Sequence, residues 1–123
     1  MARHNELGRL GEQIAAEYLI KKGYTIRDSN WRWQRYELDI VCEHNGRIVI
    51  VEVKTRTSGF IEPADAITRQ KMLYLVKAAN VYVKLYNLRH EIQFDVVTIV
   101  GREPDFKINH IEDAFYAPAK TYR

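Results

Sequence analysis

The sequence predicts a single α/β domain in which helices flank a central β-sheet. Two observations support this class: amphipathic helical patterns alternate with strand patterns along the chain, and a hairpin rich in valine and isoleucine lies between the two helical segments. The 123 residues suffice for one domain with a buried core, so we expect residues 1–123 to fold as one unit. The core is expected over about residues 5–100, because residues 102–123 have the least readable pattern in the chain.

The composition is typical of a soluble globular protein, with 46% hydrophobic and 28% charged residues. No apolar run approaches the roughly 20 residues that span a bilayer, and the first residues lack the apolar stretch of a secretion signal. We therefore expect a cytoplasmic protein without a membrane partner. Cys42 is the only cysteine, which excludes an internal disulfide and a thiolate metal cluster. The net charge of +3 permits a polyanionic partner.

The first expected element is a helix over residues 6–22. Asn5 can cap its N-terminus, and Gly23 is suited to end it in the left-handed region. One side of this helix is apolar at helical spacing and should face the core, with Glu12 at the border of the apolar stripe.

A short strand over residues 24–28 and a loop over residues 29–36 should follow. The loop interleaves basic residues with aromatic ones, namely Arg32, Arg35, Trp31, Trp33 and Tyr36. Such side chains can hold phosphates and stack on exposed bases, which predicts nucleic-acid binding. Alternatively, one or both tryptophans belong to the core beside the strand.

Residues 37–54 are expected to form a β-hairpin. Asn45-Gly46 favours a type I′ turn, since both central positions of that turn need positive φ. Counting outward from this turn gives the opposed pairs His44–Arg47, Val41–Ile50, Asp39–Glu52 and Glu37–Lys54. One face is then entirely apolar, with Leu38, Ile40, Cys42, Val49, Val51 and Val53. The other face ends in four charged residues, Glu37, Asp39, Glu52 and Lys54.

The charged end of the hairpin suggests a metal site. Directly opposed carboxylates are destabilising, so Asp39 and Glu52 require compensation. Lys54, on the same face, offsets part of the repulsion, and a divalent cation between the carboxylates would offset more. Mg²⁺ uses few protein carboxylates and takes its other ligands from water and phosphate. The alternative is a solvated strand face with exposed ion pairs, each worth about 0 to 1 kcal/mol.

Residues 55–62 are expected to form a loop, followed by a second helix over residues 64–86 with Pro63 in its first turn. Lys71 falls within the apolar stripe of this helix, which comprises Ala64, Ile67, Tyr74, Leu75, Ala78, Tyr82 and Leu85. A strand over residues 91–100 follows, in which we interpret Asp95 as a structural acid.

Together these segments resemble a known family. "ELDIV" followed by "VIVEVKTR" resembles the D…(D/E)-x-K signature of the restriction-endonuclease-like nucleases. Over roughly residues 7–100, the chain is similar to the small YraN-like family of bacterial proteins, which is related to the archaeal Holliday junction resolvases. The similarity runs in order through "GRLGEQIAAEYLIKKGY", "NWR", "ELDIV", "VEVKTR", the second helix and "FDVV".

The resemblance implies a restriction-endonuclease-like core, with a central mixed sheet flanked by helices in the order α-β-β-β-α-β. It also implies a metal-dependent endonuclease that hydrolyses DNA phosphodiesters, branched or Holliday-junction DNA included. Mg²⁺ or Mn²⁺ would be held by Asp39, Glu52 and the backbone carbonyl of Val53. Lys54 would be the catalytic lysine, and Glu12 an acid at the edge of the site. A homodimer is implied as well, since a four-way junction has twofold symmetry.

Further residues bear on the substrate. Arg56 and Lys71 are expected to contact phosphate. Gln70 begins a Q-x-x-x-Y pattern with Tyr74 that resembles a motif of some nucleases of this superfamily. Tyr36 stands where the family usually has glycine, which would narrow access to the metal. The alternative to an enzyme is a non-catalytic nucleic-acid-binding module that retains the nuclease fold.

Overall fold

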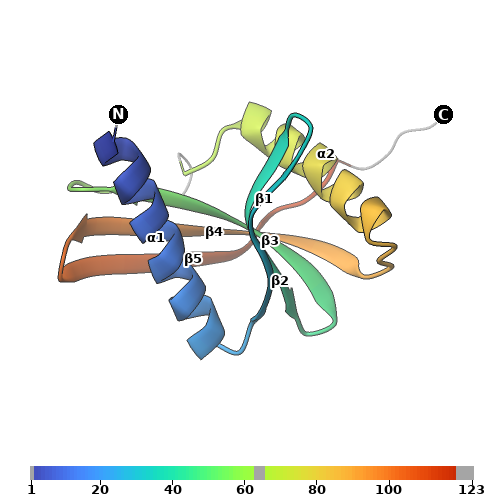
Figure 1. Ribbon diagram of the computed structural model, residues 1–123, viewed down its shortest axis with the longest axis horizontal. Helices are drawn as coiled ribbons and strands as arrows, with labels where there is room; N and C mark the ends of the chain where they lie inside the picture. The colour runs from blue at the N-terminus through green and yellow to red at the C-terminus, as the bar shows by residue number, and fades with distance from the viewer. Residues whose placement is uncertain (1, 63–65, 119–123) are drawn as a thin grey trace.

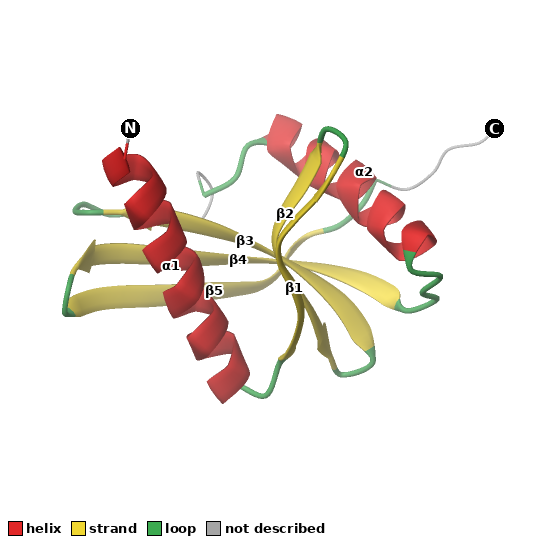
Figure 2. Ribbon diagram, viewed as in Figure 1, coloured by secondary structure: helices red, strands yellow, loops and turns green. Residues whose placement is uncertain are grey.

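The computed structural model describes residues 2–62 and 66–118 and contains two helices and five strands. In chain order the elements are α1 (Ala2–Lys21), β1 (Thr25–Trp33), β2 (Tyr36–His44), β3 (Arg47–Arg56), α2 (Arg69–Leu85), β4 (Glu91–Arg102) and β5 (Asp105–Phe115) (Figures 1 and 2). The predicted α/β class is confirmed, and β5 extends the expected order of elements by one strand.

The sheet is mixed, and its strand order follows the chain, β1-β2-β3-β4-β5. Neighbouring strands are antiparallel except for β3 and β4, which are parallel and are connected through α2. The helices cover opposite faces of the sheet (Figure 1): Leu19 of α1 packs in one core cluster with Val49, and Tyr82 of α2 packs in the other with Ile50. Within the described ranges, neither helix is long and apolar enough to span a bilayer.

Helix α1 ends at Lys21, with Gly23 just past its end as expected, but it begins earlier than expected. Gly23 has a φ of 97°, and the Tyr24 N–H donates to the Leu19 carbonyl at 2.9 Å. This is the bond pattern of a Schellman motif, which favours glycine because glycine has no Cβ. The expected cap at Asn5 is wrong, since the helix already runs from Ala2; no glycine or proline among the first residues interrupts it.

Gly11 allows α1 to approach β3 closely. The residue is buried, and a Cβ at this position would overlap the Cγ2 methyl of Thr55 on β3. We expect Gly11→Ala to lower the free energy of unfolding by about 1 to 3 kcal/mol, because the added methyl must displace packed atoms. Urea unfolding would measure this loss.

Two further variants make the Gly11 prediction specific. A Cβ at Gly8, on the same helix, would meet nothing within 4 Å outside the helix backbone. Gly8→Ala should therefore stabilise the protein by up to about 1 kcal/mol. Thr55→Ser removes the overlapping methyl and should restore most of the stability lost in Gly11→Ala. A Gly11→Ala protein as stable as the wild type would contradict this explanation.

The predicted loop over residues 29–36 is wrong, because β1 continues through it to Trp33. Trp31 pairs with Leu38 of β2, and the turn between the two strands takes only two residues. The ring of Trp31 is in the core, at 7% exposure, and this burial stabilises the longer strand.

The β2–β3 hairpin has the expected turn. Asn45 and Gly46 have φ angles of 53° and 74°, as a type I′ turn requires. The strands pair in the expected register from this turn as far as Ile40 and Val51. The register prediction is therefore confirmed over the part of the hairpin next to the turn.

Helix α2 begins at Arg69, later than expected. Thr68 caps it, because its side-chain oxygen accepts the backbone N–H three residues later at 3.1 Å. Pro63 and Ala64, the expected first residues, lie outside the described residues. Leu85, expected in the buried stripe, is 45% exposed because it is the last residue of the helix. The helix buries Leu75, Ala78, Ala79 and Tyr82.

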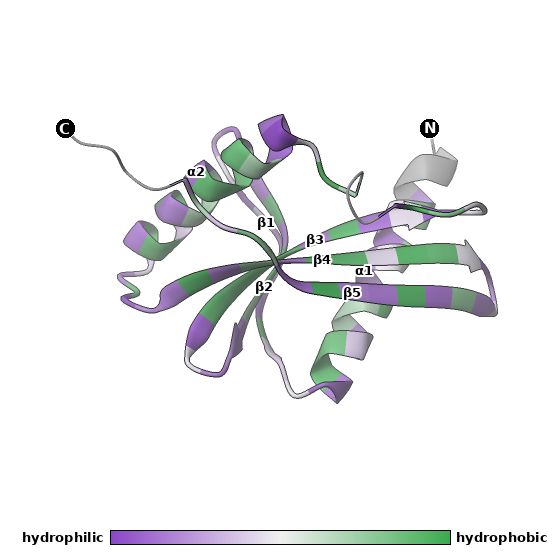
Figure 3. Cartoon of the chain, turned by 180° about the vertical axis from the view of Figure 1, so that it is seen from behind, coloured by the Kyte–Doolittle hydropathy of each residue, from purple (hydrophilic) through white to green (hydrophobic). Residues whose placement is uncertain are grey.

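The C-terminal segment forms the edge strand β5 against β4. Figure 3 shows hydrophobic and hydrophilic residues alternating along β5, as expected for a strand with one face toward solvent. β5 carries His110, whose Nε2 lies 2.7 Å from the Oδ2 of buried Asp95. The Asp95 carboxylate also accepts hydrogen bonds from Gln93 Nε2, the Tyr24 hydroxyl and the Asp113 N–H. Four partners therefore surround this acid, which agrees with its structural interpretation.

Candidate active site

Strands β2 and β3 separate beyond the pair Ile40–Val51, and Asp39 lies at the point of separation. Figure 1 shows the β1–β2 hairpin turning toward α2, while β3 continues on the side of α1. The Asp39 Oδ2 accepts the Val53 backbone N–H at 2.9 Å. The carboxylate therefore takes the place of a bond between the strand backbones.

The separation corrects two expectations about the hairpin. The ladder ends before it reaches the expected pairs Asp39–Glu52 and Glu37–Lys54. Leu38 also leaves the apolar face expected for it, since it packs beneath α2 whereas Ile40 packs beneath α1. The neighbouring strand β1 is also irregular here: Asn30, between the residues that pair with Ile40 and Leu38, has a φ of 51°. A residue with positive φ breaks the regular alternation of strand side chains.

Glu52 is the most buried acid of the site. The residue is 7% exposed, and its Oε2 lies 3.4 Å from the Nζ of Lys71 on α2. Burial raises the pKa of Glu52 above its ordinary value, the charge of Asp39 raises it further, and Lys71 lowers it in part. Carboxylates perturbed in this way are more frequent at functional sites than elsewhere.

Glu12 reaches the same place from α1. Burial and the charge of Asp39 raise the pKa of Glu12, whereas a hydrogen bond from the Asn30 side chain lowers it in part. The helical spacing that predicted Glu12 at the border of the apolar stripe agrees with this half-buried position.

Asp39 lies near both glutamates, since its charge contributes to the raised pKa values of Glu12 and Glu52. The three carboxyl groups do not converge on one point: in residues 2–62 and 66–118, no three His, Cys, Asp or Glu side chains are grouped to hold a metal ion. A divalent ion at this place would therefore depend on Asp39 and Glu52 together with other oxygens. Mg²⁺ and Mn²⁺ accept such a set, because they also bind carbonyl, water and phosphate oxygens.

The backbone carbonyl of Val53 is another oxygen of the site. The N–H and C=O of a strand residue point to the same edge of the strand, and the Val53 N–H points to Asp39. The carbonyl therefore faces the opening left by β2, where the ladder has ended. Asp39, Glu52 and Val53 together fit the chemistry of a Mg²⁺ or Mn²⁺ site.

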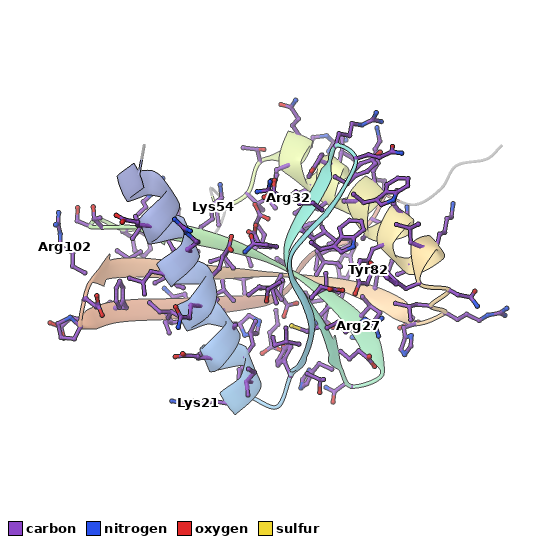
Figure 4. All side chains as sticks on the ribbon, in the orientation of Figure 1. Lys21, Arg27, Arg32, Lys54, Tyr82 and Arg102 are labelled. Atoms are coloured by element: carbon purple, nitrogen blue, oxygen red, sulfur yellow. The ribbon has the colours of Figure 1, made fainter. Side chains whose placement is uncertain are left out.

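Lys71, rather than Lys54, is the cation in contact with Glu52. Lys54 lies two residues beyond Glu52 on β3 and is exposed. Figure 4 shows Lys54 between α1 and the β1–β2 hairpin in this view. Lys71 reaches Glu52 because it lies on the stripe of α2 that faces the sheet. Its position within this apolar stripe is the feature of the sequence that indicates its orientation toward the sheet. No local pattern pointed to Asn30, whose position depends on the distortion of β1.

Tyr74 connects the β1–β2 hairpin to α2 through hydrogen bonds of its hydroxyl. Its hydroxyl donates to the Arg35 carbonyl at 2.9 Å and accepts the Glu37 N–H at 2.7 Å. Its ring centre lies 5.8 Å from that of Tyr36, with 37° between the planes. The Q-x-x-x-Y pattern therefore places Gln70 and Tyr74 one helical turn apart beside the hairpin.

Tyr74→Phe is expected to lower the free energy of unfolding by about 1 to 3 kcal/mol, since both hydrogen bonds to the hairpin backbone are lost while the ring remains. Urea unfolding would measure the loss. Tyr116→Phe is the control, because that hydroxyl makes one hydrogen bond, to Asp113, on a residue that is 77% exposed. Equal free energies of unfolding of Tyr74→Phe and Tyr116→Phe would show that the Tyr74 hydrogen bonds do not stabilise the packing of the hairpin on α2.

The other residues expected to bind nucleic acid differ in exposure. Trp31 is in the core, and its Nε1 donates to the Tyr86 hydroxyl at 3.0 Å, so it offers no face to a base. The alternative of a core tryptophan therefore holds for Trp31. The exposed residues of this set are Arg32, Trp33, Arg35, Arg56 and Gln70. Arg32 also lies 3.4 Å from Glu37 as an ion pair.

Comparison with known proteins identifies a family that this chain matches. Residues 11–99 match the model of a family described as "Uncharacterised protein family UPF0102". A UPF0102 protein of Parabacteroides distasonis is 46% identical over 121 residues, covering 98% of this chain and 100% of the relative. A UPF0102 protein of Bacteroides fragilis is 47% identical over 119 residues, with 96% and 98% covered. One of Flavobacterium psychrophilum is 47% identical over 117 residues, with 94% and 98% covered.

Proposed function

This chain belongs to the uncharacterised protein family UPF0102, and we propose that it is a metal-dependent endonuclease that hydrolyses DNA phosphodiesters, including those of branched or Holliday-junction DNA. The observation that carries the proposal is the pair of acids, Asp39 and Glu52, at the opening between β2 and β3. Adjacent carboxylates in a half-closed site are unfavourable unless a cation or substrate uses them. The D…(D/E)-x-K resemblance supports the same reading.

The proposed roles follow from the positions of the residues. Asp39, Glu52 and the Val53 carbonyl would hold Mg²⁺ or Mn²⁺. When bound, the metal would polarise the phosphate and lower the pKa of a bound water. Lys54, exposed beyond Glu52 on the same strand, would orient the attacking water or stabilise charge on the phosphate. Glu12 lies at the edge of the same site.

Basic residues around the opening would bind the phosphate backbone. Arg32 and Arg35 lie near the free end of the β1–β2 hairpin, and Arg56 lies at the end of β3. Lys71, which lies 3.4 Å from the Glu52 carboxylate, would move to a phosphate oxygen once a metal neutralises that carboxylate. Contacts of this kind determine affinity and its dependence on salt, but not sequence preference.

One observation favours a second function, a non-catalytic nucleic-acid-binding module. The Lys71–Glu52 ion pair already neutralises one of the two acids without a metal. A binding module predicts salt-sensitive DNA binding that survives Asp39→Asn and Glu52→Gln, since the phosphate contacts come from other residues.

The nuclease proposal is tested by incubating the full chain with Mg²⁺ or Mn²⁺ and labelled linear, flapped and four-way DNA. We expect cleavage that requires the metal and is lost in EDTA. Asp39→Asn is the control preparation, because cleavage that it carries out at the wild-type rate would come from a contaminant. Folded protein that cleaves none of these DNAs would contradict the enzymatic function and favour the binding module.

A further inference from the structure

Two neighbouring hollows lie along α2, between Lys71, which contacts Glu52, and the turn of the β1–β2 hairpin. The first has a volume of about 350 Å³ and is lined by Thr68, Gln70, Lys71 and Tyr74. The second has a volume of about 290 Å³ and is lined by Arg35, Tyr36, Gln70, Leu73, Tyr74 and Lys77. Because Gln70 and Tyr74 line both, the two hollows are neighbours along the first half of α2, one on either side of this pair, and we treat them as one surface groove. We call it the tyrosine groove.

One end of the tyrosine groove lies at the proposed catalytic site. Lys71 lines the first hollow, and its Nζ is 3.4 Å from the Glu52 carboxylate. The other end lies at Arg35, in the turn between β1 and β2. A strand with a phosphate at the acid pair would therefore have its neighbouring nucleotides along this groove.

The lining of the groove combines aromatic rings with positive charge. The rings of Tyr36 and Tyr74 lie side by side, with 5.8 Å between their centres. The Arg35 guanidinium lies 5.2 Å from the Tyr36 ring centre, and the Lys71 Nζ lies 5.0 Å from that of Tyr74. Lys77 is a third cation, and the residues that line the two hollows include no Asp or Glu. Proteins that bind single strands use this combination, since bases stack on the rings and phosphates pair with the cations.

The tyrosine rings are held in place before any ligand arrives. The Tyr74 hydroxyl is fixed by its two bonds to the hairpin backbone, and the Tyr36 hydroxyl accepts a hydrogen bond from Arg35 at 3.3 Å. Side chains ordered in advance lose less conformational entropy on binding. A groove of this kind is suited to a ligand with exposed flat faces.

We propose that the tyrosine groove binds an unpaired segment of DNA next to the phosphate that is cleaved. A base within a duplex has both faces covered by its neighbours, so only an unpaired base can stack on Tyr36 or Tyr74. The inference rests on the proposed function for the position of the cleaved phosphate. It specifies the substrate class as DNA with a flap, overhang or gap, in place of continuous duplex.

The test is a binding measurement with the full chain in EDTA, where no metal-dependent cleavage occurs. Fluorescence anisotropy compares a labelled oligothymidylate of about 12 nucleotides, within the usual site size of single-strand binders, with a blunt duplex of equal length. We expect the single strand to bind more tightly. Tyr36→Leu and Lys77→Gln should each weaken single-strand binding about fivefold or more, and duplex binding much less.

Two controls separate the groove from general effects of charge and folding. Lys84→Gln removes the same charge from the last turn of α2, outside the groove, and should change single-strand binding less than about twofold. Tyr36→Phe retains the ring and loses only the hydrogen bond from Arg35, so its single-strand binding should lie between that of the wild type and that of Tyr36→Leu. If Tyr36→Leu does not fold, the comparison of Lys77→Gln with Lys84→Gln and the preference for single strands still decide the result.

The proposal is overturned if the duplex binds as tightly as the single strand, if neither binds, or if Lys77→Gln and folded Tyr36→Leu bind like the wild type. Failure of the nuclease function looks different: single-strand binding persists in EDTA, and no DNA is cleaved with metal. Conversely, cleavage of blunt duplex that Tyr36→Leu leaves unchanged would reject the groove and keep the nuclease.

Discussion

Asp39→Asn is expected to reduce DNA cleavage by about 100-fold or more, because the variant loses a negatively charged ligand of the proposed metal. The fold should be retained. The asparagine carbonyl can still accept the Val53 N–H, which Asp39 accepts at 2.9 Å. The variant also removes a charge that raises the pKa values of both Glu12 and Glu52, so its free energy of unfolding without metal should equal or exceed that of the wild type.

Thermal unfolding with and without Mg²⁺ measures this effect independently of cleavage. A metal that binds only the folded wild type stabilises it by about 2.7 kcal/mol at a concentration of 100 times the Kd, whereas Asp39→Asn should show little of this stabilisation. Asp39→Ala is the matched comparison, because it loses the acceptor for Val53 as well and should be about 1 kcal/mol less stable than Asp39→Asn. Equal Mg²⁺ stabilisation of the wild type and Asp39→Asn would remove Asp39 from the metal site.

Asp95→Asn is expected to lower the free energy of unfolding by about 3 kcal/mol at neutral pH, since hydrogen bonds to a buried charge are among the strongest in a protein. Asp95 is 1% exposed, and its carboxylate meets His110, Gln93, Tyr24 and the Asp113 N–H. Asparagine keeps the volume but brings a donor to a place where the carboxylate accepts every bond. Asp113→Asn is the control, because Asp113 makes its side-chain contact at the surface.

The free energy of unfolding lost in Asp95→Asn should be smaller in acid than at neutral pH. Burial alone would raise the pKa of Asp95, but the hydrogen bonds from His110, the Asp113 N–H and Gln93 together hold it below its ordinary value of 3.8. A group with a lowered pKa stabilises the folded state above its unfolded pKa and loses that contribution as the pH falls through the folded value. The difference in free energy of unfolding between wild type and Asp95→Asn should thus be largest at neutral pH and should decrease as the pH falls below 3.8. A difference that stays constant down to pH values well below 3.8 would show that the charge of Asp95 is not its cause.

Most of the fold follows from patterns that act over a few residues. The two helices, the β2–β3 hairpin and the β4 strand were predicted from apolar periodicity, and Asn45-Gly46 was sufficient to set the register as far as Ile40 and Val51. The boundaries were less predictable. β1 runs through a predicted loop because Trp31 is buried by distant residues, and α2 starts at the cap residue Thr68. The edge strand β5 was not predicted, because its alternation of hydrophilic and hydrophobic residues is short and is interrupted at His110.

The candidate site was predicted in its residues but not in its geometry. Asp39, Glu52, Glu12 and Lys54 stand out in the sequence because charge interrupts an apolar pattern, and the resemblance to D…(D/E)-x-K nucleases gives them proposed roles. The expectation of direct pairing between Asp39 and Glu52 was wrong, since the ladder ends one residue earlier and Asp39 binds β3 through its side chain.

By itself, the sequence determined the two helices and the strands of the core other than β5, where the hairpin turns, and which acids lie near its far end. These properties depend on the spacing of apolar residues and on turn conformations, which are local. Only the tertiary structure decided that β2 leaves β3 at Asp39, that Lys71 pairs with Glu52, and that four groups surround Asp95. Apart from the Gln93–Asp95 bond within β4, these contacts join residues far apart in the sequence, so they depend on how the helices and strands pack together.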